Sequence, residues 1–348
     1  MMKNKMKILL PFFDDSTLFF ATSMYEHLSK KGLNAEIVED VSSNGHVGVS
    51  ERQFNEIAAG IPRKKTSDLF TKTEQLSQYS AVLISKTTVE LRELLNSDYK
   101  LHEKRPKFVT FYPGLEFTPL KGFKNREFYD AIYFNNYDHL KLYKSIYSHR
   151  EKEQYLSYGH PYLKMPMSQK EPNSGAVYFF AQALSPATYE SRRHIVDILI
   201  AIAKKNPARK VVLKLRHLPN ENTEHVHKEK YDYVSLLPNE VPENFELSAK
   251  NMKECLDDAS IAITCTSTAA MDAISAGVNT LVYTEYVEYY QDKLARYMNK
   301  EFLGSNLLTS LDDLLHLRVS KPNDDWLKDN FRSEDFFDDI TSYLHNLL

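Results

Sequence analysis

The stretch Ser260–Glu285 reads SIAITCTSTAAMDAISAGVNTLVYTE, and it decides the fold class of this chain. An apolar run ends at Thr264, hydroxyl side chains follow, and a helical pattern leads to Gly277 and a second apolar run. This order predicts a buried strand, a capped helix and the next parallel strand of the same sheet. The backbone N–H groups at the helix start suit an anionic ligand, although ordinary capping explains the hydroxyl groups equally well. The hydroxyl groups belong to Thr266, Ser267 and Thr268.

The same alternation of strand and helix patterns fills both halves of the 348-residue chain. Helical patterns separate most of the apolar runs, which is typical of parallel sheets covered by helices. We therefore predict an α/β protein with two Rossmann-like domains facing a cleft. The predicted strands lie at 7–13, 34–38, 80–85, 107–111, 131–134, 176–181, 210–215, 233–236, 259–264 and 280–283.

Domain boundaries follow from one polar, proline-containing stretch at 164–175, which is the candidate linker. It separates an N-terminal Rossmann-like domain at 1–165 from a C-terminal one at 166–322. We expect the remaining segment, 323–348, to form a C-terminal helix that packs back towards the N-terminal domain.

Composition and charge exclude several classes of protein. The formal net charge is −3, so we expect no nucleic-acid partner. Cys255 and Cys265 lack zinc-type spacing, and so few thiols indicate a cytoplasmic protein without a disulfide framework. The apolar run at 8–13 ends at two aspartates, so it is too short for a signal peptide or a membrane span.

Basic and polar side chains cluster at the end of the predicted strand at 210–215. Basic and imidazole groups there suit a nucleotide phosphate, and a glutamate can accept hydrogen bonds from ribose hydroxyls. A solvated loop would have the same composition. The histidine spacing fits no familiar zinc site, so we expect no bound metal. The residues are Lys214, Arg216, His217, Glu221, Thr223 and His225.

Carboxylates follow two predicted strands of the first half. Asp14 and Asp15 come directly after the first strand, and Glu116 comes shortly after the strand at 107–111. A carboxylate in such a place can act as general base on a hydroxyl group. A helix cap and a tight turn explain the same residues. In the second half, Gln182 follows the first strand, where a ligand phosphate or sugar can bind.

A basic strand end paired with a hydroxyl-rich helix start resembles the nucleotide-binding motifs of several transferases. Here Arg216 and Thr266 carry this pattern. The families are bacterial sialyltransferases, Kdo transferases and teichoic-acid glycerophosphotransferases, which use CMP- or CDP-linked donors and the two-domain architecture called GT-B. They usually read His-Pro in the first motif, where this chain reads His217-Leu218-Pro219.

Most of the chain also resembles an uncharacterised family of bacterial proteins that are inferred to be GT-B glycosyltransferases. The family pattern has an Asp-Ser turn, a Pro-Gly turn with a later proline, Phe-Ala-x-Gln-like spacing before a proline, and a Val-Lys-x-Arg strand end with downstream Glu, Thr and His. This chain lacks the residue between Ala and Gln and has Leu213 in place of the valine. The matching residues are Asp15-Ser16, Pro113-Gly114 with Pro119, Phe180-Ala181-Gln182 with Pro186, and Lys214 and Arg216 with Glu221, Thr223 and His225.

These resemblances imply a glycosyltransferase. The domain at 166–322 then binds a nucleotide-sugar, and the domain at 1–165 holds the acceptor. The preferred donor is a CMP-linked nonulosonic acid of the sialic or pseudaminic type, or Kdo, and the acceptor is a surface glycan or a lipid-linked glycan. The candidate bases are Asp15, Asp14 and then Glu116. The candidate donor ligands are Gln182, Lys214, Arg216, His217, Glu221, Thr223, His225, Thr266, Ser267 and Thr268.

No acidic motif of the DxD type stands out, so we expect metal-independent transfer with no cofactor besides the donor. The helical stretch His139–Arg150 is basic and amphipathic. It is either a half-buried surface helix or a site of peripheral contact with the inner membrane face. Two other functions stay open: a sugar-nucleotide epimerase of the same architecture, and a non-catalytic nucleotide- or carbohydrate-binding protein.

Overall fold

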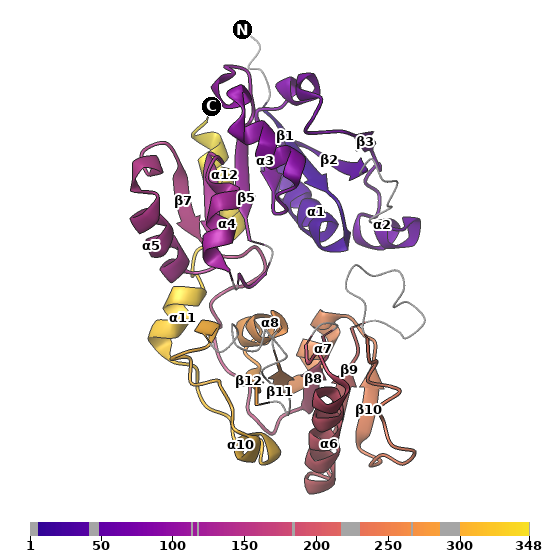
Figure 1. Cartoon of the computed structure of the whole chain (residues 1–348). Coiled ribbons are helices and arrows are strands. Elements are labelled where there is room, and N and C mark those ends of the chain that lie inside the picture. The colour runs from indigo at the N-terminus through magenta and orange to yellow at the C-terminus, as the bar shows by residue number, and fades with distance from the viewer. Residues whose placement is uncertain are drawn as a thin grey trace. The chain divides into compact units, whose positions relative to one another are not determined.

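The computed structural model describes residues 6–41, 49–112, 114–116, 118–182, 185–216, 230–265, 267–285 and 300–347. The chain forms two compact units, each with its own sheet (Figure 1). Unit 1 contains Met1–Lys164 and Asp329–Leu348, and unit 2 contains Met165–Lys328. Unit 1 thus ends at Lys164, one residue before the expected end at 165. The chain returns to unit 1 at Asp329, six residues after the expected position 323.

Unit 1 contains a seven-stranded parallel sheet in the order β3-β2-β1-β4-β5-β6-β7. Its strands are β1 (Lys7–Phe12), β2 (Asn34–Val41), β3 (Lys65–Ser67), β4 (Ala81–Ile84), β5 (Lys107–Phe111), β6 (Ala131–Phe134) and β7 (Tyr155–Tyr158). Its helices are α1 (Asp15–Lys30), α2 (Glu51–Ile57), α3 (Val89–Asn96), α4 (Pro119–Arg126), α5 (Tyr137–Ile146) and α12 (Phe336–His345). Short 3-10 helices lie at η1 (Thr73–Gln78), η2 (Asp98–Leu101) and η3 (Ser148–Arg150).

Both faces of this sheet are buried, which explains why its inner strands have continuous apolar sequences. On one face, Ile8, Leu10 and Phe12 of β1 pack in a core with α1, α2 and α12. Leu9 belongs to the core on the opposite face, to which α3, α4 and α5 contribute. The alternation along β1 follows from the two-residue period of a strand.

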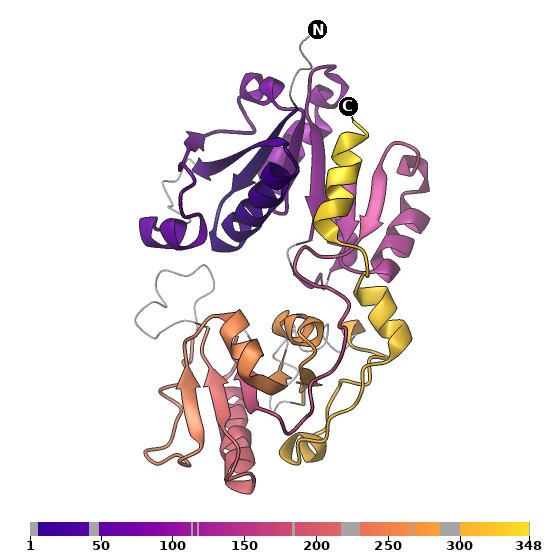
Figure 2. The ribbon, with the colours of Figure 1, turned by 180° about the vertical axis from the view of Figure 1, so that it is seen from behind.

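The C-terminal helix α12 belongs to unit 1. Phe336, Ile340 and Leu344 repeat every four residues and join the same core as α1, and Figure 2 shows the two helices on one face of the sheet. The carboxylate of Asp339 accepts a hydrogen bond from the hydroxyl of Tyr155 on β7 (2.9 Å). Apolar packing and this polar contact together attach the end of the chain to the sheet.

Unit 2 contains a five-stranded parallel sheet in the order β10-β9-β8-β11-β12. Its strands are β8 (Ala176–Phe180), β9 (Val211–Lys214), β10 (Phe245–Ser248), β11 (Ala259–Thr264) and β12 (Asn279–Val282). Its helices are α6 (Tyr189–Lys205), α7 (Met252–Asp258), α8 (Ala269–Ser275) and α10 (Leu311–Leu315), while α11 (Asp324–Asn330) crosses the boundary between the units. Two parallel sheets with helical crossovers confirm the predicted α/β class.

One predicted strand of unit 2 is wrong. Residues 233–236 form a turn, in which the Ser235 N–H donates to the carboxylate of Asp232 (2.9 Å). Tyr233 and Leu236 are buried in the core of unit 2, so their apolar character reflects packing rather than extended backbone. The edge strand is β10 instead, and its exposed middle residues hide it in the sequence.

Candidate functional site

Each sheet has one place where the order of its strands reverses. In unit 1 the reversal lies between β1 and β4, and in unit 2 it lies between β8 and β11. Ligands of open parallel sheets bind outside the carboxyl ends of the strands at such a switch point. The segments that follow these strands are therefore the candidate sites of the two units.

A pocket of about 380 Å³ lies at the switch point of unit 1. Its lining comes from the segments after β1, β4 and β5 and from the end of α4. The charged side chains in it are Asp14, Lys86, Glu116 and Arg126. The structure thus brings together two of the three candidate bases, although they lie far apart in the sequence.

Asp14 caps helix α1. Its carboxylate accepts hydrogen bonds from the backbone N–H and the hydroxyl of Thr17 (3.0 and 2.7 Å) and from Lys86 Nζ (3.2 Å). Burial alone raises the pKa of Asp14, but the hydrogen bonds from Thr17 and the charge of Lys86 outweigh it, so the pKa lies below its usual value. These contacts favour the role of Asp14 as a helix cap over a role as general base, because a carboxylate that is held in its ionised form is a weak base. Asp15 begins α1, but its side chain lies outside the described part of the structure.

Glu116 lies in the turn after β5, and Gly122 on α4 makes room for it. Its Oε1 accepts hydrogen bonds from the backbone N–H and the hydroxyl of Thr118 (2.8 and 3.0 Å). A Cβ atom on Gly122 would lie 2.8 Å from Glu116 Oε2 and 2.8 Å from the ring of Tyr112. Only glycine therefore fits there without moving both side chains. Among the described residues, Oε2 has no hydrogen-bond partner.

Arg126 is a charged residue of this pocket that sequence reasoning missed. Its side chain is buried, and its guanidinium stacks on the ring of Tyr112 at 4.0 Å from the ring centroid. A basic residue in the last turn of a helix normally stabilises the helix C-terminus, so no sequence signal separated Arg126 from an ordinary surface arginine.

In unit 2, a buried arginine holds the loop after β8. The guanidinium of Arg192 donates to the backbone carbonyls of Gln182 (2.7 Å), Pro186 (2.9 Å) and Tyr231 (2.7 Å). This clamp fixes the backbone at Gln182. A contact between the Gln182 side chain and a donor stays a prediction.

Lys214 and Arg216 lie at the carboxyl end of β9, as expected. Lys214 Nζ donates to the carbonyl of Leu215 (2.8 Å), and burial lowers the pKa of Lys214. Arg216 is exposed and forms no ion pair with a described residue. The other candidates of this segment lie outside the described residues, so their roles stay predictions. They are His217, Glu221, Thr223 and His225.

The segment after β11 contains Ser267 and Thr268, while Thr266 lies outside the described residues. Ser267 Oγ accepts a hydrogen bond from the N–H of Ala269 (3.0 Å). Thr268 occupies the N-cap position of α8, and its side chain makes no capping hydrogen bond. Of the two hydroxyl side chains that the structure describes in this segment, Ser267 is therefore the one that caps the helix.

Asp272, one turn into α8, is a second residue that sequence reasoning missed. Burial raises its pKa to about 6, yet the residue keeps an intermediate exposure. No described side chain donates a hydrogen bond to it. An ionised carboxylate with open acceptor positions can bind ligand hydroxyl groups. In the sequence it resembles an ordinary acidic residue in a first helical turn.

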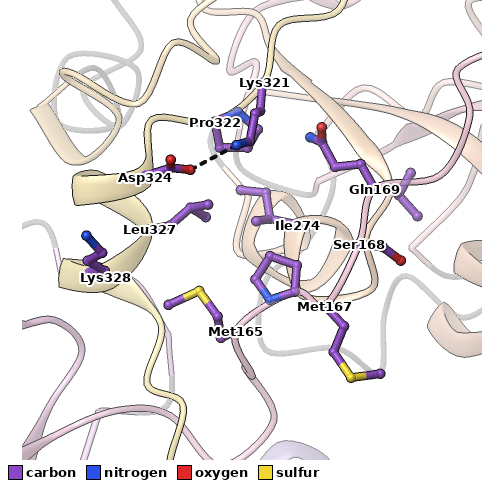
Figure 3. Close-up of a pocket in the computed structure, with 12 residues that line it drawn as sticks. Met165, Met167, Ser168, Gln169, Ile274, Lys321, Pro322, Asp324, Leu327 and Lys328 are labelled. Carbon is purple, nitrogen blue, oxygen red and sulfur yellow. Dashed lines mark ion pairs between the residues drawn. The ribbon is translucent and has the colours of Figure 1, made fainter.

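A further pocket of unit 2, of about 350 Å³, lies away from this switch point (Figure 3). Val278, which lines it, directly precedes β12, so the pocket lies towards the amino ends of the strands. Its lining is largely apolar, and the figure shows Met165, Ile274 and Leu327 gathered around it. Lys321 at its rim pairs with Asp324 (3.2 Å). We assign no donor contact to this pocket.

The stretch considered for membrane contact contains α5 and η3. Leu142 and Ile146 of α5 are exposed, but the two lysines of the helix form ion pairs with Asp138 and Glu151 (2.7 and 3.0 Å). Paired lysines attract anionic lipid less strongly, and peripheral membrane contact stays a prediction. In the part of the chain that the structure describes, no helix has the length and apolar character for crossing a membrane.

Two parallel α/β units with candidate sites at their switch points define a protein of the GT-B class. A family model described as "Putative glycosyltransferase (DUF6716)" matches residues 14–347, and the chain belongs to this family. The predicted family and architecture are thereby confirmed. The resemblance to sialyltransferases and Kdo transferases stays a prediction.

Solved structures show the same fold over the whole chain. MnaA of S. aureus in a co-structure with UDP has 10% identity and a TM-score of 0.61, with 99% of this chain and 98% of that chain covered. UDP-GlcNAc 2-epimerase from Neisseria meningitidis, bound to UDP-GlcNAc, has 11% identity and a TM-score of 0.60, with 98% and 100% covered. The enzyme of that name from Methanocaldococcus jannaschii has 9% identity and a TM-score of 0.61, with 98% and 99% covered. A search of curated protein sequences found no match.

The cap of α1 predicts a pH dependence of stability. Because the pKa of Asp14 is lower in the folded than in the unfolded protein, its contribution is present above the unfolded value and is lost as the pH falls through the folded value. Asp14→Ala should cost about 1 kcal/mol of unfolding free energy at pH 7. Asp14→Asn retains a capping side chain but cannot titrate. The difference in unfolding free energy between this variant and wild type should therefore shrink below pH 4. Urea unfolding between pH 3 and 7 measures this difference, and a constant value would contradict the assignment.

Proposed function

We propose that this protein is a GT-B glycosyltransferase that transfers a sugar from a nucleotide-linked donor to a hydroxyl group of a glycan. The observation that carries the proposal is the pocket at the switch point of unit 1, where Glu116 has one carboxylate oxygen without a described partner. Membership of a family described as glycosyltransferases supports the same reaction class.

The donor binds unit 2 in this proposal. Arg216, exposed at the end of β9, binds the donor phosphate through charge-assisted hydrogen bonds. Asp272, which is mostly ionised at pH 7 because its pKa is about 6, accepts hydrogen bonds from the ribose hydroxyls. Ser267 and Thr268 complete the phosphate site.

The preferred donor remains a CMP-linked nonulosonic acid or Kdo. This preference rests on the pairing of Lys214 and Arg216 with the hydroxyl-rich segment before α8. UDP-sugars are the competing donors, because similar folds have been solved with UDP and with UDP-GlcNAc.

The acceptor binds unit 1 in this proposal. Glu116 removes the proton from the acceptor hydroxyl while that oxygen forms a bond to the anomeric carbon. The bond between the anomeric carbon and the phosphate oxygen breaks, and the nucleotide leaves with its electron pair. Arg216 stabilises the charge on the leaving phosphate. This single displacement inverts the anomeric configuration and needs no metal ion.

Loss of either donor ligand should weaken nucleotide binding. Arg216→Ala removes hydrogen bonds worth roughly 1.5–3 kcal/mol each, so we expect the Kd to rise about 10–100-fold. Wild-type affinity should fall more steeply than that of Asp272→Asn as the pH drops through about 6, because protonation of Asp272 adds to protonation of the nucleotide's own phosphate. Calorimetry with CMP, CDP, UDP and GDP measures both effects.

The control for these variants is Arg318→Ala, which removes an exposed arginine of the same unit that pairs with Asp312. Unchanged affinity in both site variants would remove unit 2 as the donor site. Tight binding of UDP or GDP without binding of CMP or CDP would remove the cytidine preference alone.

Loss of the base should stop turnover while nucleotide binding persists. Glu116→Gln keeps the size of the side chain but cannot accept the proton, so kcat should fall about 10²–10⁴-fold. Steady-state transfer assays with a radiolabelled donor measure it, and exposed Glu74→Gln is the matched control. Normal turnover of Glu116→Gln would remove Glu116 as the base, and a loss in Asp15→Asn would then assign that role to Asp15.

A sugar-nucleotide epimerase is the second candidate. Two of the solved structures described above as similar in fold are named UDP-GlcNAc 2-epimerases. An epimerase needs no acceptor. NMR of the donor incubated alone with the protein separates the two reactions: formation of an epimer supports the epimerase, and an unchanged donor that reacts only after glycan is added supports transfer. Nucleotide binding without either reaction, across varied acceptors, supports a non-catalytic binding protein.

A further inference from the structure

Arg126 has an unusual set of partners for a buried charge. It is 7% exposed and forms no ion pair with a described residue. Its described hydrogen bonds run from Nε to Thr110 Oγ1 (3.3 Å), from Nη1 to the carbonyl of Gly122 (3.4 Å) and from Nη2 to the carbonyl of Ser85 (3.0 Å). A guanidinium has five N–H donors, so one on each terminal nitrogen has no described acceptor.

Comparison with Arg192 shows that the contacts of Arg126 are weaker than those of a buried arginine that only holds backbone in place. Arg192 is also buried, at 1% exposed, and its three carbonyl contacts are shorter, at 2.7–2.9 Å. Charge-assisted hydrogen bonds normally lie in that short range. The longer contacts of Arg126 compensate its buried charge less well, and Arg126 also lines a pocket. A buried cation without a counter-ion destabilises the fold unless an anion from outside pairs with it.

A second donor in the same pocket lacks an acceptor. Tyr112 is 2% exposed and lines the pocket, and its hydroxyl donates no hydrogen bond to a described residue, although the guanidinium of Arg126 lies near its oxygen. The Tyr112 ring supports the guanidinium of Arg126 from one side. Buried hydroxyl groups almost always form hydrogen bonds. An acceptor atom of a bound ligand would therefore complete the hydrogen bonding of the Tyr112 hydroxyl.

The other charges of the pocket leave room for an anion. Asp14 is already neutralised by Lys86 at 3.2 Å. Glu116 accepts hydrogen bonds from Thr118 through Oε1, which leave its negative charge in place. Arg126 is therefore the cation of this lining that forms no ion pair with a described carboxylate.

We propose that Arg126 and Tyr112 bind an oxyanion, a phosphate or a carboxylate, that belongs to the glycosyl acceptor. Arginine suits such a group because its donors on two nitrogens can hold two oxygen atoms of one anion. The acceptor then presents its hydroxyl to Glu116 and its anionic group to Arg126. That the anion belongs to the acceptor rests on the proposed function, whereas its binding to Arg126 does not.

Inorganic phosphate and acetate are the probes that test this site. Binding is measured by calorimetry at constant ionic strength, without a donor, in the Arg216→Ala chain so that the donor site does not contribute. Arg126→Gln should weaken binding at least about tenfold, because it removes charge-assisted hydrogen bonds. Tyr112→Phe preserves the ring and removes only the hydroxyl, so it should weaken binding about 3–10-fold. Arg52→Gln, at an exposed arginine of α2, should leave binding unchanged.

Thermal unfolding of each variant identifies a loss of folding, and Tyr112→Phe keeps the test decisive if Arg126→Gln does not fold. Tighter phosphate binding indicates a phosphorylated acceptor, and tighter acetate binding indicates an acidic sugar. Equal affinity in the Arg216→Ala parent chain and in the same chain carrying Arg126→Gln or Tyr112→Phe, or no binding of either probe, overturns the proposal. If anion binding depends on Arg126 but Glu116→Gln retains normal turnover, the oxyanion site stands and the assignment of the acceptor to it falls.

Discussion

Burial of both faces of each parallel sheet is the constraint on which the rest of the structure depends. Parallel strands need crossover connections that return over a face of the sheet, and those connections cover the apolar side chains. All carboxyl ends consequently gather at one edge, where polar side chains from distant parts of the sequence meet. In unit 1 this edge collects Asp14 after β1, Lys86 after β4 and Glu116 after β5. The fold thus produces a charged pocket without a local sequence motif.

The two units use buried charge in different ways. Arg192 of unit 2 binds three nearby carbonyls at short distances and so fixes the loop after β8. Arg126 of unit 1 has longer contacts and lines a pocket. Unit 2 instead has the exposed Arg216 after β9 and the poorly solvated Asp272 on α8. In the proposed function, Arg216 binds the leaving phosphate and the pocket of unit 1 binds the acceptor.

Sequence patterns predicted the inner strands well because burial on both faces makes them continuously apolar, as in β1 and β6. They missed β3, β7 and β10, which are edge strands with fewer buried residues. The apolar residues at 233–236 gave a false strand because they pack into the core from a turn.

Prediction of the site had the same physical limits. The positions of Asp14, Glu116, Lys214 and Arg216 could be predicted because they lie at or shortly after the ends of recognisable strands, while their roles stay predictions. Arg126 and Asp272 lie on helices, where only the tertiary packing distinguishes a ligand-facing charge from a solvated one. The spacing of charges along a helix does not contain that information.

Backbone hydrogen–deuterium exchange, with and without the nucleotide that binds most tightly, tests the central assignment of donor to unit 2 most directly. The account predicts that the nucleotide slows exchange in residues 211–216 and 267–275, while residues 14–18 and 85–87 of unit 1 keep their rates. Protection confined to the unit 1 segments, with no change after β9 and β11, would contradict it.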